Sequence, residues 1–316
     1  AHRWTHWLSA ATAINIKNYL RMQASLLGTF VDDRQREARS ANASRRLTPA
    51  IFLSYRPTQL VDLRLNAFYK QSYRYPTFND LYYTDMGNAY LKPELAKQHS
   101  VGLSFTQPFR IAQQRGSEFR INADYYYNRI SDKIIAYPKG QQFRWTMLNL
   151  GLVKINGLDV NAQLHFVLPE NFYLTAKAQY TYQTAVDVTD PSDTYYGHQI
   201  PYIPWHSGSA VGILGWQNDW MQYGLNYSFI YVGERYNQQE NILFNYTQPW
   251  YTHDLSVYGE WDIYKVKGER LEVKGKKLFT LRVALDVNNL LSQDYDVILN
   301  YPMPKRNYKC TISITY

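Results

Sequence analysis

The acidic residues with the most regular close spacing lie in one stretch, where Asp187, Asp190 and Asp193 stand three residues apart. Carboxylate oxygens are ligands that Ca²⁺ prefers, but this spacing does not match an EF-hand loop. His2 and His6 stand four residues apart, a spacing that brings two imidazoles together on a helix, whereas the residues around them alternate as in a strand. The acidic stretch is therefore interpreted as a solvated loop, and the sequence predicts no metal site.

Motifs for catalysis and for tightly bound cofactors are missing from the sequence. It contains no glycine-rich phosphate loop, no G-x-S-x-G nucleophile elbow and no paired acid–base motif. The single cysteine, Cys310, excludes an intrachain disulfide framework and a multi-cysteine metal site. We therefore predict no catalytic residue and no cofactor, and a protein that is not an enzyme.

The composition is rich in tyrosine and poor in charge. The 316 residues include 30 Tyr, and charged residues make up only 19%. Hydrophobic residues (45%) are dispersed, and no apolar run approaches the roughly 20 residues that a membrane-spanning helix needs. The abundance of aromatic residues also argues against a disordered chain. The net charge of +8 is spread along the sequence rather than clustered, so no nucleic-acid partner is predicted.

Apolar and polar residues alternate with a period of two through most of the chain. The alternation is clearest in 308–316 and 279–287, and it recurs in 119–128, 174–183 and 221–231. Because successive side chains of a strand point to opposite faces, each segment is predicted to be an amphipathic strand. About thirteen such segments, each of roughly 10 to 15 residues, follow one another from the N-terminus onward.

Alternation fits both a soluble β-sandwich and a membrane barrel, because both have one apolar face. The segments are longer than the about 5 to 6 residues of globular strands and reach the about 9 to 11 of a tilted membrane-spanning strand. Tyrosines gather near strand ends, as in the aromatic girdles of outer-membrane barrels, and tight turns alternate with long connections. The sequence therefore predicts an all-β fold, a transmembrane antiparallel β-barrel in contact with outer-membrane lipid.

The expected connections divide into two sets, and the strands into two faces. Long connections are expected at 32–44, 74–97, 132–151, 185–204, 234–250 and 290–306. Tight turns are expected at 17–18, 56–59, 168–171 and 216–219, with two longer members of that set at 107–117 and 265–276. The polar strand faces would line the barrel interior with polar side chains and with charges of both signs. Their members are Arg64, Asn66, Asp124, Lys177, Gln179, Asp254, Glu260, Asp262, Arg282 and Asp286.

The long connections are rich in Tyr, Trp, Asn and Arg. Large rings with polar tips suit recognition of a bulky ligand such as a corrinoid, a metal chelate or a sugar. The alternative is that these side chains form the outer aromatic girdle or pack loop against loop, and the group Arg74, Pro76 and Asp80 is interpreted as a structural clamp. The candidate ligand-binding residues are Arg74, Tyr75, Phe78, Tyr82, Tyr83, Tyr195, Tyr196, Arg235, Tyr236, Trp250, Tyr251 and Tyr301.

One of these connections contains a recognisable signature. Residues 70–83 read K-Q-S-Y-R-Y-P-T-F-N-D-L-Y-Y, followed by Gly87-Asn88 and Leu91-Lys92-Pro93-Glu94. This closely resembles the F-R-x-P-T-x-x-D-L-Y … G-N-x-x-L-K-P-E signature of TonB-dependent outer-membrane receptors. Further similar stretches follow in the family's order over almost the whole chain, at 126–134, 149–151 with 156–159, 288–291 with Tyr295, and the terminal strand that ends in Tyr316.

The resemblance implies a barrel of about 22 strands that encloses an N-terminal plug domain. Thirteen strands is an odd number, whereas single-chain bacterial barrels usually have even counts. The chain also begins at Ala1 without an initiator Met. We therefore expect residues 1–316 to be the C-terminal part of the barrel, about its last thirteen strands, with the plug and the earlier strands outside this chain.

The function that the resemblance implies is active transport across the outer membrane of a Gram-negative bacterium, energised by the TonB complex through the missing plug. Residues 199–208, and 295–298 with 301–304, look more like the cobalamin and iron-chelate (siderophore) receptors than the larger glycan importers. The sequence as a whole resembles those of Bacteroides-type bacteria. The alternatives are a glycan importer of the same family, a non-transporting adhesin or binding barrel, and a soluble secreted β-protein. A surface lipoprotein is a further candidate partner.

Overall fold

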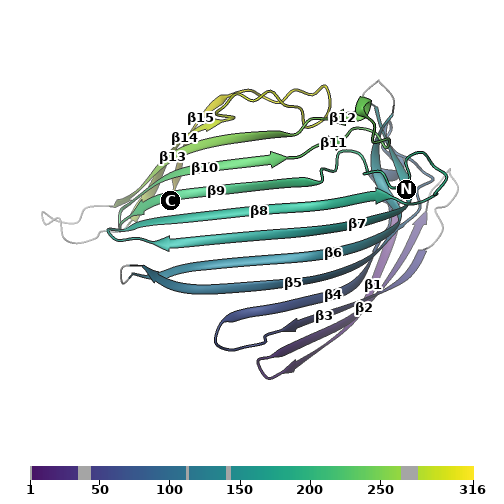
Figure 1. The fold of residues 1–316 in the computed structure, drawn as a ribbon, viewed down its shortest axis with the longest axis horizontal. Helices are drawn as coiled ribbons and strands as arrows, with labels where there is room; N and C mark the ends of the chain where they lie inside the picture. The colour runs from purple at the N-terminus through teal and green to yellow at the C-terminus, as the bar shows by residue number, and fades with distance from the viewer. Residues whose placement is uncertain (1, 35–43, 112–113, 140–143, 265–276) are drawn as a thin grey trace, which may run out of the picture.

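The computed structural model describes residues 2–34, 44–111, 114–139, 144–264 and 277–316, and strands make up most of them (Figure 1). The first half contains β1 (His2–Ile16), β2 (Leu20–Arg34), β3 (Ser44–Tyr55), β4 (Asp62–Arg74), α1 (Phe78–Tyr82), β5 (Glu94–Ile111), β6 (Gln114–Lys139) and β7 (Arg144–Val167). The second half contains β8 (Phe172–Asp187), β9 (His206–Gln217), β10 (Met221–Val232), β11 (Arg235–Tyr236), η1 (Leu243–Asn245), β12 (Tyr246–Thr247), β13 (Trp250–Tyr264), β14 (Lys277–Asn288) and β15 (Asn307–Thr315).

Thirteen of these strands form one antiparallel sheet in which neighbours in sequence are neighbours in space. Its order is β1-β2-β3-β4-β5-β6-β7-β8-β9-β10-β13-β14-β15, and β11 pairs separately with β12. Figure 1 shows this large sheet as a single curved surface, with β1 and β15 as its two edges. The prediction of thirteen long antiparallel strands is confirmed. In the described ranges, no helix is both long enough and apolar enough to cross a membrane.

The register of the sheet confirms which side chains share a face. Residues paired across neighbouring strands point to the same side, and the polar residues predicted to face the interior all fall on one side. Arg282, for example, lies opposite Glu260, and Asp286 lies opposite Ser256. We call this side the inner face.

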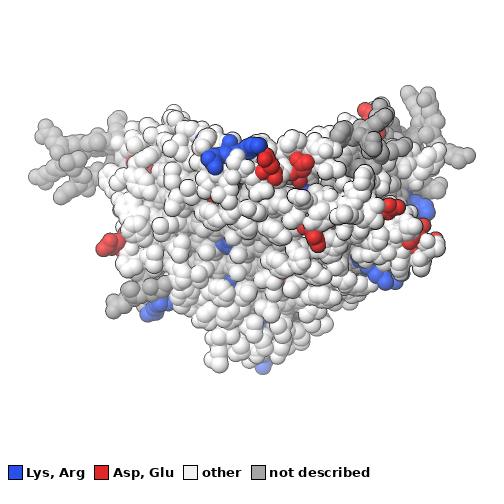
Figure 2. All heavy atoms as spheres, turned by 45° about the horizontal axis from the view of Figure 1, so that its top comes forward, with Lys and Arg blue, Asp and Glu red and all other residues white. Residues whose placement is uncertain are grey.

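The opposite side, the outer face, carries the apolar half of the alternation. One row crosses seven strands by direct pairing, and several of its members are exposed: Phe166, Leu174, Leu214, Leu225, Val257, Leu285 and Cys310. Lys, Arg, Asp and Glu cover only a small part of the surface seen in Figure 2. An exposed apolar face of this size is the surface that a barrel presents to lipid.

Two connections differ from the sequence prediction because strands continue through them. The segment 132–151, expected as a long loop, is the extended end of the β6–β7 hairpin, in which Lys133 pairs with Leu150 and Lys139 with Arg144. Its Ile134 is buried with Leu81 and Leu91 from the preceding connection. This tertiary packing explains why strand pairing persists there, and no local pattern could reveal it.

The segment 107–117 also pairs as strand for most of its length. Pro108 suggests a turn, because proline cannot donate to a strand ladder. In the structure Pro108 nevertheless lies opposite Glu118, and Phe109 packs against Phe166 with the ring centroids 5.5 Å apart. The other predicted connections and turns coincide with breaks between strands, except that 265–276 and most of 32–44 lie outside the described residues.

Candidate functional site

The connection between β4 and β5 is built around a clamp. The Asp80 carboxylate accepts hydrogen bonds from Arg74 Nη2 and from the Thr77 backbone N–H, both at 2.9 Å. The Thr77 hydroxyl in turn accepts from the Asp80 N–H, which completes a capping box at the start of α1. The clamp interpretation of Arg74, Pro76 and Asp80 therefore matches the geometry, with the Arg74 side chain still partly exposed.

A second arginine, Arg3 of β1, braces the same connection from the neighbouring hairpin. Its guanidinium makes a two-point ion pair with Asp33 (2.6 and 2.8 Å) and donates to the Pro76 carbonyl at 2.7 Å. The same group lies 4.5 Å from the ring centroid of Tyr75 and 4.7 Å from that of Phe78. Two of the predicted ligand-binding rings are thus engaged by a cation of the protein itself.

The environment of Tyr75 changes the pKa of its hydroxyl group. Burial, and then the nearby Asp33 carboxylate, raises the pKa of Tyr75 to about 12. The phenol therefore stays protonated at neutral pH and can act as a hydrogen-bond donor. Sequence reasoning did not identify Arg3, because nothing in the strand around it distinguishes it from a solvated arginine.

The remainder of the signature docks on the extended β6–β7 hairpin. The Asn88 side chain donates to the Met147 carbonyl (3.0 Å), and the Asn149 side chain donates to the Lys92 and Asp132 carbonyls (3.0 and 2.7 Å). The Glu94 carboxylate accepts from the Ile134 N–H at 3.0 Å. These polar side chains therefore hold the connection in place and are not free to contact a ligand.

The connection between β8 and β9 is fastened by buried amides. Gln199 is almost fully buried: its Oε1 accepts from the Ala185 N–H (2.7 Å), and its Nε2 donates to the Gln183 and Ile203 carbonyls (both 3.2 Å). Its backbone N–H donates to Asn241 Oδ1 at 2.6 Å, which links it to the next connection. Sequence reasoning missed these amides because a Gln or Asn in a polar loop resembles a solvated residue.

Arg235 fastens the connection between β10 and β13 to the one between β14 and β15. Its side chain is only 2% exposed and donates to the carbonyls of Gln248 (3.2 Å), Asp296 (2.7 Å) and Val297 (3.1 Å). Burial lowers the pKa of the Arg235 guanidinium. Its hydrogen-bond donors are thus directed at the protein backbone.

The remaining candidates divide by exposure. Tyr82, Tyr195, Tyr236 and Trp250 are half-buried, with Tyr236 packed on Trp205 at 5.7 Å and Trp250 stacked on Tyr295 at 4.5 Å. Tyr251 is exposed on the outer face of β13, paired with Tyr231. The rings exposed in the long connections include Phe78, Tyr83, Tyr196 and Tyr301, together with Tyr90 and Phe244, which are not among the residues predicted from the sequence.

The acidic stretch forms local turns. Asp187 Oδ1 accepts from the Thr189 N–H (2.9 Å), and Asp190 Oδ1 accepts from the Ser192 N–H (2.9 Å). The hydrogen bonds from the Ser192 backbone N–H and hydroxyl lower the pKa of Asp190. Among the described residues, no three His, Cys, Asp or Glu side chains are grouped closely enough to hold a metal ion.

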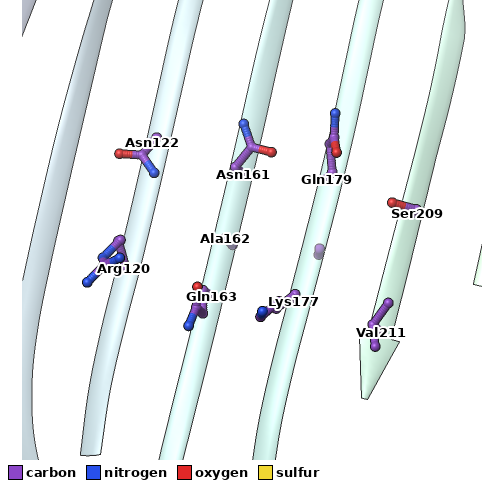
Figure 3. A pocket seen from close by; sticks show the side chains of 10 residues that line it. Arg120, Asn122, Asn161, Ala162, Gln163, Lys177, Gln179, Ser209 and Val211 are labelled. Carbon is purple, nitrogen blue, oxygen red and sulfur yellow. The ribbon is translucent and has the colours of Figure 1, made fainter. Parts of the chain in front are cut away.

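The inner face is hollowed at the middle of β6 to β9 by a shallow cavity of about 370 Å³. Figure 3 shows its polar side chains arranged in rows across the strands. Arg120 is paired with Glu118 at 2.8 Å, so the wall combines neutral amides with this ion pair and the Lys177 ammonium group. The lining includes Arg120, Asn122, Asn161, Gln163, Lys177, Gln179 and Ser209.

Comparisons with known proteins agree with this architecture. Residues 15–290 match the family model "TonB dependent receptor-like, beta-barrel". The vitamin B12 transporter BtuB of Photobacterium profundum is 25% identical over 265 residues, covering 81% of this chain and 36% of that protein. BtuB of Vibrio vulnificus is 37% identical over 90 residues, covering 28% of this chain and 13% of that protein.

Solved structures show the same fold. The copper transporter OprC has a TM-score of 0.66 at 15% identity, covering 99% of this chain and 47% of that chain. BauA, the ferric preacinetobactin receptor of Acinetobacter baumannii, has a TM-score of 0.67 at 15% identity, and the match covers 99% of this chain and 43% of that chain. The chain thus spans less than half the length of these relatives.

The matched region extends from the last residues of β1 to just beyond β14 and includes most of the sheet and its long connections. An apolar outer face, a polar inner face and long connections at one end are the arrangement of outer-membrane barrels. The chain therefore belongs to the TonB-dependent receptor β-barrel family of the Gram-negative outer membrane.

Proposed function

We propose that residues 1–316 form the C-terminal strands and loops of a receptor that imports a scarce, bulky nutrient, with a cobalamin or an iron chelate as its substrate. The observation that carries this proposal is the similarity to a vitamin B12 transporter over 81% of the chain. The neighbour described as a ferric preacinetobactin receptor supports the iron-chelate alternative. In this proposal the long connections recognise the ligand and the strands form part of the barrel wall, and no residue performs chemistry.

Import in this proposal is energised by TonB, which acts on a plug domain outside this chain. The inner face supports such an arrangement, because its amides and paired charges can hydrogen-bond a polar domain of either sign. The two unpaired sheet edges and the partial coverage of the relatives support assigning 1–316 to the last thirteen strands of a larger barrel. Closing a barrel in lipid requires every edge to be paired.

Ligand recognition in this proposal falls to the rings exposed in the long connections. Tyr83, Tyr90, Tyr196 and Tyr301 offer ring faces and hydroxyl groups to a bulky ligand. The more buried candidates shape this surface from beneath. Arg74 and Arg235 hold the loops that carry it, through the clamp at Asp80 and the carbonyls of the last connection.

Growth of a strain that lacks the full-length gene tests the proposal. Cobalamin, iron chelates and glycans are each supplied as the limiting nutrient, in cells with and without TonB. We expect the deletion to abolish growth on either cobalamin or an iron chelate, and loss of TonB to have the same effect. Growth defects confined to glycans would favour a glycan importer. Normal uptake with reduced surface attachment would favour an adhesin.

The surface lipoprotein remains a prediction that no described contact supports or opposes. Gentle purification of the full-length receptor from its own outer membrane would reveal a stoichiometric lipoprotein if one covers the long connections. Absence of such a protein at stoichiometric amount would remove this partner from the proposal.

A further inference from the structure

Three basic residues form a row on the outer face of the sheet. The register pairs Lys97 of β5 with Arg129 of β6, and Arg129 with Lys154 of β7. Adjacent strands are about 4.8 Å apart, so the three side chains start within roughly 10 Å of one another. Lys97 and Arg129 are exposed, and Lys154 is half-buried. We call these residues the basic row.

The placement of the basic row on the outer face follows from the same register. Two residues along each strand, the next row contains Tyr69, His99 and Tyr127, whose neighbouring rings lie 4.9 and 6.0 Å apart. The rows after that contain Val101 with Tyr125 and then Leu103 with Ala123. Cations, aromatic rings and aliphatic side chains thus succeed one another in the direction away from the long connections.

This order is that of a membrane interface. Aromatic rings favour the headgroup level, and aliphatic side chains favour the hydrocarbon beneath it. Rows two residues apart are separated by roughly 7 Å along the strand, so the basic row lies just outside the aromatic belt. The phosphate groups of outer-leaflet lipid occupy that level on the long-connection side.

Among the described residues, no carboxylate forms an ion pair with the basic row. The row continues into Gln71 on β4 and Val186 on β8, which carry no charge. Like charges directly opposite on neighbouring strands destabilise a sheet. An anion bridging the three cations would relieve this repulsion.

We propose that Lys97, Arg129 and Lys154 bind the phosphate groups of a phosphorylated glycolipid in the outer leaflet. The three cations supply a site for a lipid that carries phosphate, and the aromatic and aliphatic rows below supply contacts for its acyl chains. The site lies on the lipid side of the sheet, so it is independent of the nutrient that the receptor imports. It fixes the height of the barrel in the membrane beside the β6–β7 extension.

The test uses the full-length receptor in detergent, with diphosphorylated lipid A and the same lipid after removal of its phosphates as probes. Bound lipid is quantified by native mass spectrometry. We expect at least a tenfold preference for the phosphorylated lipid. Because one cation near an anionic surface contributes about a fivefold effect, the variant K97Q/R129Q/K154Q should lose the preference. Raising the salt concentration to about 1 M should reduce it in the wild type.

The matched control, R64Q/R120Q/K177Q, removes the same charge from the inner face and should retain the preference. Heat-modifiable gel mobility establishes that each variant is folded. If the triple variant does not fold, the three single variants replace it, and each should lose about fivefold. Equal binding of the two lipids by the wild type, an unchanged preference after the outer-face substitutions, or an equal loss in the control would overturn the proposal.

Discussion

Leu285→Arg provides the most direct test of which face of the sheet meets lipid. Leu285 is 52% exposed on the outer face of β14, opposite Val257 on one side and Cys310 on the other. It belongs to the apolar row of the outer face that crosses seven strands. An arginine on the lipid face near the bilayer midplane costs about 2 to 4 kcal/mol. That cost lowers the folding equilibrium constant by roughly 30-fold to 1000-fold.

The matched variant is Ser256→Arg on the inner face of the adjacent strand. Ser256 lies opposite Asp286, so the new guanidinium would meet a carboxylate in a polar surrounding and should cost much less. Leu285→Ala separates the loss of the leucine side chain from the effect of the added charge. All three substitutions are made in the full-length receptor, because an isolated part of a barrel leaves strand edges unpaired.

Reversible urea unfolding in phospholipid bilayers gives the free energy of unfolding of each variant. We expect Leu285→Arg to be less stable than both Leu285→Ala and Ser256→Arg by about 2 kcal/mol or more. Equal destabilisation by the two arginines would refute the assignment of faces. A larger effect at Ser256 would reverse that assignment.

Three further predictions concern the clamp, the exposed rings and the last residue. Asp80→Ala removes the Arg74 ion pair and the capping box, so hydrogen exchange of 75–93 should accelerate by about tenfold. Unchanged exchange there would contradict the clamp. Tyr83→Ala should weaken binding of the imported ligand by about fivefold or more, whereas Tyr251→Ala on the outer face should not, as measured by ligand titration. Equal effects of the two substitutions would argue against recognition by the loops. Replacing Tyr316 with Ser should lower the amount of folded receptor at the cell surface, if the terminal aromatic strand is the signal for barrel assembly; unchanged surface labelling would count against this role.

The fold could be predicted well from sequence because a strand's facing is a local property. Side chains alternate between two environments, so the contrast between lipid and lumen is visible at every second residue, as Leu281 and Arg282 illustrate. A one-residue slip in register would place every polar side chain in lipid, and pairing is therefore strongly specified. The strand ends were less predictable. The β6–β7 extension persists because another segment packs on Ile134, and that segment lies far away in the sequence.

The candidate site was harder to predict because residue type does not distinguish a side chain that binds ligand from one that holds a loop. Arg235 has the type expected of a ligand contact, yet its donors are satisfied by three backbone carbonyls. An arginine takes this role where the backbone of a connection leaves carbonyl groups without partners. The number of such carbonyls depends on how the connection folds. A buried polar group left without a partner costs about 1 to 3 kcal/mol. Long polar loops therefore recruit arginine and amide side chains as internal partners, and the rings that remain exposed, such as Tyr83, are those whose hydroxyl groups water can satisfy. Among long loops at one end of a barrel, exposed aromatic residues are thus the first candidates for ligand contacts. A charged residue becomes a candidate only when its side chain is not already hydrogen-bonded to the backbone.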